Sequence, residues 1–307
     1  MIHIHNGDVT AMLARRSGLE GEHLPFRESL VAGAVPGSIS EHDWIETRAR
    51  FLSDAYGENL LRVRNDLLEQ ERALDAAAAQ DEVVLWFEHD LFCLTNFLYL
   101  LTRLARHPRV TAVWCDQPIG TREEGDMHPL FDSRRAVTPA MFAAAQRGWS
   151  AYTAADPTVL NGMIRGEDPD FPFLRTGLEL HAMRFPATRN GLGAVESRAM
   201  ALIAAGAADF ATVFDAFNND IPRYGLGDGE FYRVLWRLAN VAVPMLTMTK
   251  GDGPPTPPKA LFAVTPAGEK VMAGDADFLD LNGTDFWLGG AHLTNGKVWR
   301  WDGRQLV

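Results

Sequence analysis

The sequence lacks the features of a membrane or secreted protein. No uninterrupted apolar stretch approaches the ~20 residues that a membrane-spanning helix needs, and the first residues, MIHIHNGDVTAML, do not combine a basic start with a long apolar core, as a signal peptide does. There are only two cysteines, Cys93 and Cys115, both in apolar contexts and without the CxxC spacing of a metal site. We therefore expect a cytoplasmic protein with reduced thiols and no membrane partner.

Nucleotide motifs and basic surfaces are also missing. The sequence contains no GxGxxG and no GxxxxGK[ST], so neither dinucleotide nor P-loop phosphate binding is indicated. The net charge is −11, and residues 1–174 carry 16 Lys+Arg against 26 Asp+Glu. Residues 175–307 carry 13 against 14. Because nucleic acids bind basic surfaces, this balance disfavours DNA or RNA as a partner of the first part and is neutral for the second.

The composition is that of a folded globular protein, with 307 residues of which 47% are hydrophobic and 22% charged. Strand-like and helical stretches alternate in the first part. The predicted strands lie at 2–5, 22–26, 82–88 and 109–116, and the predicted helices near 9–18, 40–56, 58–79 and 90–107. Strands separated by helices favour βαβ units, so we predict an α/β, Rossmann-like domain with a parallel sheet.

The rest of the chain divides into two further regions. Residues 121–175 are turn-rich and contain local helices, which is typical of a connecting region. Residues 176–307 show three short helices followed by two strand-like stretches, the layout of a winged helix, and Asn295-Gly296 predicts a terminal β-hairpin. The predicted domains are therefore 1–120, a connection over 121–175, and a mainly helical, winged-helix-like domain over 176–307.

Polar residues follow each predicted strand. The set comprises Asn6, Gly7 and Asp8, then Arg27 and Glu28, then Glu88, His89 and Asp90, and finally Asp116. In an open parallel sheet, ligands bind in the crevice at the carboxyl ends of the strands. We expect these residues to converge on one edge, to bind a small molecule, and to raise the pKa of at least one carboxylate or histidine through crowding.

Two readings of this cluster remain open. In an enzyme of hydrolysis or group transfer, His89 would be the general acid/base, Glu88 and Asp8 would orient it or hold a divalent metal, and Arg27 would fix an anionic group. In the structural alternative, Asp90 only caps the helix that it starts and His89 only packs. His3 and His5 share one strand face and could ligate a metal, although packing within the sheet is the favoured interpretation.

A regulator or adaptor that binds DNA or protein through the winged-helix-like domain is the alternative function. The third helix of that domain offers Arg233, Arg237 and Asn240 to a nucleic acid, against Asp228 and Glu230. The charge balance disfavours the DNA version.

Several strings carry a family resemblance. HIHNGD, DEVVLWFEHDLF and the closing stretch with WLGGAHL and VWRWD resemble the bacterial family named domain of unknown function 1835, with its C-terminal extension. The resemblance spans nearly the whole chain, and the family name implies no established activity. This chain departs from the family pattern at Cys93-Leu94, where members often have Asp-Gln, and at Phe286, where they often have Arg.

Overall fold

A computed structural model describes residues 1–77, 79–219, 223–249 and 260–307. Its N-terminal part holds a five-stranded sheet in the order β2-β1-β3-β4-β5. The strands are β1 (Ile2–His5), β2 (Glu22–Pro25), β3 (Val83–Glu88), β4 (Val110–Cys115) and β5 (Arg135–Ala136). The first four are parallel and β5 runs antiparallel to β4. The predicted α/β class and mostly parallel sheet are confirmed.

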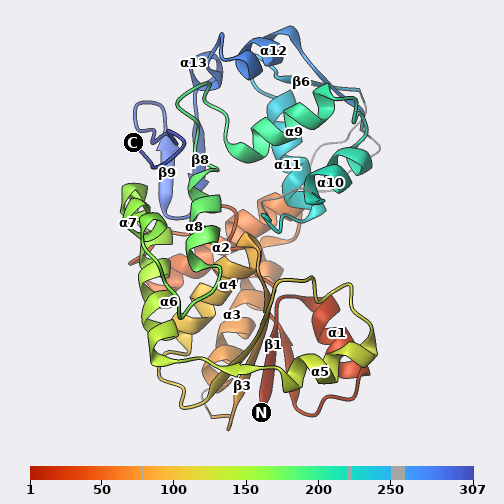
Figure 1. Cartoon of the computed structure of the whole chain (residues 1–307), viewed down its shortest axis with the longest axis vertical. Helices are drawn as coiled ribbons and strands as arrows, with labels where there is room; N and C mark the ends of the chain where they lie inside the picture. The colour runs from red at the N-terminus through yellow and green to blue at the C-terminus, as the bar shows by residue number, and fades with distance from the viewer. Residues whose placement is uncertain (78, 220–222, 250–259) are drawn as a thin grey trace.

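Four helices alternate with these strands (Figure 1). They are α1 (Asp8–Arg16), α2 (Glu41–Tyr56), α3 (Leu60–Ala77) and α4 (Leu91–Arg103). Ser40 caps α2, and Gly57 ends it in the left-handed conformation that glycine tolerates best. Helix α4 is apolar nearly all round because it lies buried between the sheet and the helices that follow.

The segment predicted as a connection folds into helices that join the same core as the sheet. It holds η1 (Glu124–Asp126), α5 (Met127–Asp132), α6 (Pro139–Tyr152), η2 (Pro157–Val159) and α7 (Leu160–Arg165) and leads into α8 (Leu174–Ala182). Thr138 and Asp156 cap the helical turns that begin at the following prolines, as their order in the sequence predicts. The apolar side chains of α6, α7 and α8 pack with those of β1, β3 and α4.

The C-terminal part surrounds a second apolar core. Its elements are α9 (Ala194–Ala204), α10 (Phe210–Asn218), α11 (Asp228–Ala239), β6 (Leu246–Met248), β7 (Phe262–Val264), α12 (Pro266–Ala273), α13 (Phe278–Asn282), β8 (Asp285–Leu288) and β9 (Ala291–Thr294). In Figure 1 these helices lie above the sheet, and β8 and β9 reach back down towards it.

The predicted terminal hairpin is displaced along the chain. The antiparallel ladder joins β8 to β9, so its turn is Gly289-Gly290, and Asn295-Gly296 closes only a single bridge between Thr294 and Lys297. The strand does not continue because Trp301 bridges instead to Ala187 and Leu306. The side chains of Val298 and Trp299 pack against the main core at the same place.

One face of the sheet carries three stacked histidines. His3 and His5 of β1 are fully buried, and the His23 ring of β2 lies 4.6 Å from the His3 ring and 5.2 Å from the His5 ring, centroid to centroid. Trp86 Nε1 donates to His3 Nδ1 at 3.1 Å, so His3 carries its proton on Nε2, which donates to the Glu20 carbonyl.

The same logic assigns neutral rings to the other two histidines. His23 Nε2 donates to the Leu19 carbonyl at 3.0 Å, which leaves its Nδ1 to accept from His5 Nε2 at 3.0 Å. Burial lowers the pKa of His3 to about 4 and that of His5 to about 2. These rings pack and hydrogen-bond within the sheet, as the favoured interpretation of the His-x-His pair has it.

Acidification is therefore expected to destabilise the protein through these histidines. The unfolded chain takes up protons near the usual pKa of 6.5, whereas folded His3 resists them down to about 4. The free energy of unfolding therefore falls as the pH drops below 6.5, by roughly 3 kcal/mol for His3 at the limit. His3→Gln, which cannot titrate, should flatten the change in urea midpoint between pH 7.5 and pH 5. His42→Gln, at an exposed position, is the control, and equal slopes in wild type and His3→Gln would contradict the account.

Candidate functional site

The carboxyl ends of the parallel strands meet at one edge of the sheet, and Asn6 and Glu88 join there. Asn6 follows β1, and its Nδ2 donates to Glu88 Oε1 at the end of β3 at 2.9 Å. The backbone N–H of Ile119, beyond β4, donates to the same oxygen at 2.8 Å. Because β2 and β3 flank β1 on opposite sides, this contact lies at the point where the strand order reverses, where open α/β sheets bind ligands.

Asp8 and Arg27 form an ion pair at the same edge. The Arg27 guanidinium donates to both carboxylate oxygens of Asp8, with a shortest distance of 2.7 Å, and both side chains are largely exposed. The hydrogen bonds from Arg27 lower the pKa of Asp8. The two predicted site residues thus neutralise each other, although an exposed pair of this kind contributes at most ~1 kcal/mol to stability.

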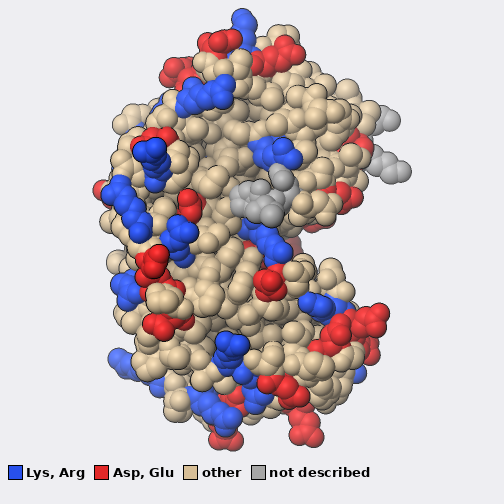
Figure 2. Space-filling model, viewed as in Figure 1, with Lys and Arg blue, Asp and Glu red and all other residues tan. Residues whose placement is uncertain are grey.

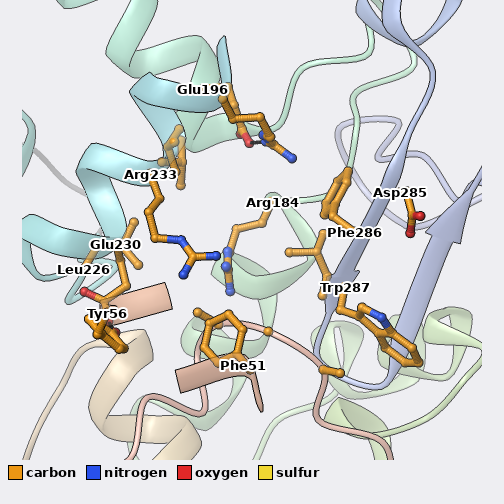
Figure 3. A pocket seen from close by; sticks show the side chains of 17 residues that line it. Phe51, Tyr56, Arg184, Glu196, Leu226, Glu230, Arg233, Asp285, Phe286 and Trp287 are labelled. Atoms are coloured by element: carbon orange, nitrogen blue, oxygen red, sulfur yellow. Dashed lines mark hydrogen bonds and ion pairs between the residues drawn. The ribbon is translucent and has the colours of Figure 1, made fainter. Parts of the chain in front are cut away.

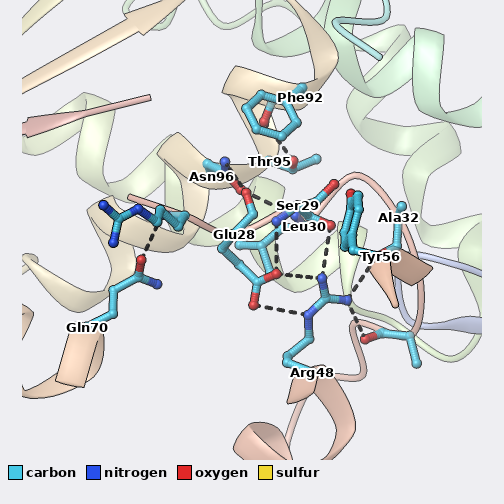
Figure 4. Close-up of polar contacts among 12 residues, drawn as sticks. Glu28, Ser29, Leu30, Ala32, Arg48, Tyr56, Gln70, Phe92, Thr95 and Asn96 are labelled. Carbon is cyan, nitrogen blue, oxygen red and sulfur yellow. Dashed lines mark hydrogen bonds and ion pairs between the residues drawn. The ribbon is translucent and has the colours of Figure 1, made fainter. Parts of the chain in front are cut away.

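Glu28 lies in the interior instead of offering a free carboxylate to a ligand. Its carboxylate accepts from Arg48 Nη2 at 2.6 Å and from Nε at 3.2 Å, and the Arg48 and Glu28 side chains are 0% and 3% exposed (Figure 4). Sequence reasoning placed Glu28 among the ligand-binding residues because it follows β2. The structure adds a role that the sequence did not indicate, since the buried ion pair fixes the chain that follows Glu28.

That chain, residues 28–35, is a loop whose carbonyl groups are held by side chains from several helices; we call it the anchored loop. Arg48 of α2 donates to the carbonyls of Ser29, Ala32 and Ala34. The remaining donors are Asn96 of α4 to Glu28, Tyr152 of α6 to Leu30, and Arg184 to Val31. Gly33 fits here because its φ is +73° and a Cβ would lie 2.4 Å from the Phe51 ring.

His89 and Asp116 lie apart from these groups. The His89 ring stacks on Phe173 at 5.6 Å and tilts against Trp114 at 4.6 Å, centroid to centroid. Its Nε2 is buried without a hydrogen-bond partner among the described residues, and burial lowers the pKa of the ring. Asp116 is exposed. The structure therefore does not bring His89 to Asp8 or Arg27.

Asp90 caps α4, as the sequence predicts. Its Oδ1 accepts from the Cys93 N–H at 2.7 Å. The first two N–H groups of the helix donate to the carbonyls of Arg223 and Tyr224. Burial, together with the charge of Glu88, raises the pKa of Asp90 to about 7. The expected rise of a carboxylate pKa in this cluster is present, with burial as its larger cause.

Glu88, Asp90 and Cys93 place potential metal-ligand atoms within 4.8 Å of one another. Both carboxylates already have partners, since Glu88 Oε1 accepts from Asn6 and Ile119, and Asp90 Oδ1 caps the helix. Burial also raises the pKa of the Cys93 thiol well above its usual range, which opposes the thiolate form that binds metals. These contacts explain the cluster as a structural link between β3 and α4.

A pocket of about 680 Å³ opens beside the sheet edge. The end of β1 contributes Asn6, Gly7 and Asp8, and the chain after β2 contributes Arg27, Glu28 and Ser29. Helices α2, α3 and α11 supply the other walls, including Tyr56, Gln70 and Glu230. Five predicted site residues therefore line one pocket, whereas Glu88, His89, Asp90 and Asp116 are not among its lining residues.

Sequence reasoning missed the helical walls of this pocket. Gln70 Oε1 accepts from the Arg27 N–H at 2.7 Å, and Glu230 Oε1 accepts from Ser29 Oγ at 2.8 Å and from the Tyr56 hydroxyl. These residues lie within helices rather than at strand ends, so their positions in the sequence carry no signal of a site. Only the packing of α3 and α11 against the anchored loop reveals them.

Comparison with known proteins finds no relative of this chain. A scan against protein-family models finds no match, and a search of curated proteins finds no similar sequence. No helix in the described part of the chain is long and apolar enough to cross a membrane.

Replacing Asp90 by Asn tests the electrostatics of the helix cap. Because the folded-state pKa is about 7 and the usual value is 3.8, the stability contributed by protonated Asp90 is full below pH 3.8 and is lost as the pH rises through 7. Asn keeps the cap without the charge. We expect Asp90→Asn to be more stable than wild type by at least about 1 kcal/mol at pH 8, with a smaller gain at pH 5.

Chemical denaturation at the two pH values measures this difference. Asp209→Asn is the matched control, because Asp209 caps α10 in the same way but is exposed and has a lowered pKa. A gain for Asp90→Asn that is the same at both pH values would show that the buried charge is not its cause.

Proposed function

We propose that the protein binds a small molecule in the pocket at the carboxyl edge of its N-terminal sheet. The observation that carries this proposal is the 680 Å³ pocket itself, which Asn6, Gly7, Asp8 and Arg27 line beside the reversal of strand order. Its volume lies within the ~300–1,000 Å³ that small-molecule sites occupy. The same residues were predicted to form a binding site from their positions after β1 and β2.

The charge of the lining favours a cationic ligand. Acidic residues outnumber basic ones, with Asp8, Glu28, Glu58, Asp66, Glu69 and Glu230 against Arg15 and Arg27. Asp8 is neutralised by Arg27, and Glu28 by Arg48. Of the remaining carboxylates, Asp66 pairs with Arg62 and Glu230 accepts from Ser29 and Tyr56, whereas Glu58 and Glu69 are exposed. The proposed ligand is therefore a small organic amine or guanidine.

The geometry does not support the proposed acid–base role of His89. Its ring lies between Trp114 and Phe173, and it is not among the residues that line this pocket. Binding is therefore the function that we propose, and hydrolysis or group transfer through His89 is not part of it.

The arrangement of the C-terminal part favours a role in lining the pockets, through α11, over a role in DNA binding. The order α9, α10, α11, β6, β7 supports a winged-helix-like unit, with Asp209 bridging to Leu261 as an extra short strand contact. However, Arg233 and Arg237 of the third helix line a cavity together with Phe51 and Phe286. Figure 2 shows positive and negative side chains mixed on the visible face, without a continuous basic stripe for phosphates.

We propose that the chain is related to the family that it resembles, and contacts among the strings that carry the resemblance support this. Asn6 and Glu88 come from two of the strings that carry it, and they hydrogen-bond to each other. The third string is also close, because the Gly289 carbonyl accepts from the Val35 N–H at 2.9 Å in the anchored loop. The first two strings therefore meet at the sheet edge, and the third contacts the end of the anchored loop.

Binding of amines tests the proposed function. We expect small primary amines and guanidines to raise the melting temperature, and alcohols and carboxylates with the same carbon skeleton to do so less. The double variant Glu58→Gln, Glu69→Gln should weaken amine binding about three- to tenfold in calorimetry, since each exposed charge contributes up to ~1 kcal/mol. Glu167→Gln, exposed and outside this pocket, is the control. Amines that bind no better than the matched alcohols would refute the proposal.

A further inference from the structure

A second pocket, of about 420 Å³, lies along the later part of the anchored loop. Its floor is formed by Ala32, Gly33 and Ala34 of the loop together with Phe51 of α2. Helix α11 and strand β8 form the other walls, and the ring of Phe286 belongs to them (Figure 3). The cavity thus has apolar walls contributed by both halves of the chain.

Arg233 projects into this cavity, and its Nη1 lacks a hydrogen-bond partner among the described residues. Figure 3 shows its guanidinium directed from α11 towards the space above Phe51, and its Cζ lies 5.1 Å from the centroid of that ring. Nη1 is buried and has no hydrogen-bond partner among the described residues. A buried guanidinium nitrogen left unpaired is costly, so an acceptor from outside the chain would be stabilising here.

Arg184 adds a second guanidinium to the same space (Figure 3). Its Nη1 donates to the Val31 carbonyl at 2.7 Å, which fixes the side chain at the loop. No carboxylate among the described residues forms an ion pair with Arg184 or Arg233. Arg237 differs, because it pairs with Glu196 and lies over the Phe286 ring at 4.6 Å.

The acidic residues of the lining are engaged elsewhere. Glu230 Oε1 accepts from Ser29 and Tyr56, and Glu196 pairs with Arg237. Asp285 is 82% exposed and accepts from His292 at 2.7 Å. The nearby charges of Glu230 and Asp54 act on Arg233, but no carboxylate among the described lining residues forms an ion pair with Arg184 or Arg233.

We propose that this pocket binds the oxyanion group of a small molecule with an apolar body, with Arg233 and Arg184 as the anion-binding residues. A carboxylate and a phosphate present the same acceptor geometry, which guanidinium groups bind through paired N–H donors. Phe51 and Phe286 would cover the apolar body. A cavity of this size, at the lower end of the range for ligand sites, fits a single-ring or short-chain compound.

This site is separate from the pocket proposed for a cation. The two share Tyr56 and Glu230 in their linings, but the first is lined by residues 28 and 29 of the anchored loop and this one by residues 32–34. Because their ligands have opposite charge, failure of amine binding leaves the anion site untouched, and the reverse also holds.

Calorimetry on the dialysed protein, residues 1–307, tests the proposal with defined probes. Benzoate and phenyl phosphate represent the two oxyanions, while benzyl alcohol and benzylamine are neutral and cationic analogues. We expect at least one oxyanion to bind tighter than both analogues, and the tighter of the two to identify the headgroup. Arg233→Met should weaken this binding by about tenfold or more, because a hydrogen bond to a charged group is lost. Arg233→Lys should lose less affinity, since it keeps the charge without the fork.

Arg72→Met, at an exposed position on α3, is the matched control and should bind as wild type does. Because Nη1 of Arg233 is buried without a hydrogen-bond partner among the described residues, Arg233→Met should fold with undiminished thermal stability, and Arg233→Lys provides the comparison if it does not. The proposal is overturned if neither oxyanion binds the folded wild type, if benzylamine binds equally well, or if affinity is unchanged in the Arg233 variants.

Discussion

The buried ion pair between Glu28 and Arg48 is the interaction on which both proposed sites depend. Removing two charges from water costs several kcal/mol for each ion, and their attraction offsets this only when the remaining donors are also satisfied. Arg48 meets that condition by donating to Glu28 and to the carbonyls of Ser29, Ala32 and Ala34. The pair thereby fixes the anchored loop, which contributes Glu28 and Ser29 to one pocket and residues 32–34 to the other.

The two pockets along the anchored loop also differ in the charge of their linings. On the sheet side, carboxylates outnumber arginines. On the side of α11, two arginines point into an apolar cavity and the acids of the lining are bound elsewhere. Tyr56 and Glu230 lie at the boundary, where Glu230 also ties α11 to the loop through Ser29. A molecule built in this way can discriminate ligands by charge with little rearrangement, because the charges are already held by the fold.

The sequence predicts those parts of this arrangement that local patterns encode. Alternating strands and helices indicate the parallel sheet, strand ends place Asn6, Asp8 and Arg27 at one edge, and a capping carboxylate starts α4 at Asp90. The role of Glu28 could not be predicted because its partner lies on a helix twenty residues away, where only packing brings the two together. The packing of His89 against Phe173 and the contact of Glu230 with Ser29 depend on later parts of the chain that cover the sheet. The hairpin forms at the WLGG turn instead of at Asn295-Gly296 because the chain beyond β9 packs on the core.

Amide hydrogen exchange of Arg48→Lys, followed by mass spectrometry, tests most directly whether this pair holds the loop. Lysine keeps the positive charge but cannot form the fork that reaches Glu28 and three carbonyls together. The account predicts that amides of residues 28–35 exchange at least about tenfold faster than in wild type, since local opening costs less, while those of β1, β3 and β4 stay protected. Unchanged exchange in residues 28–35 would contradict the claim that the ion pair shapes both sites.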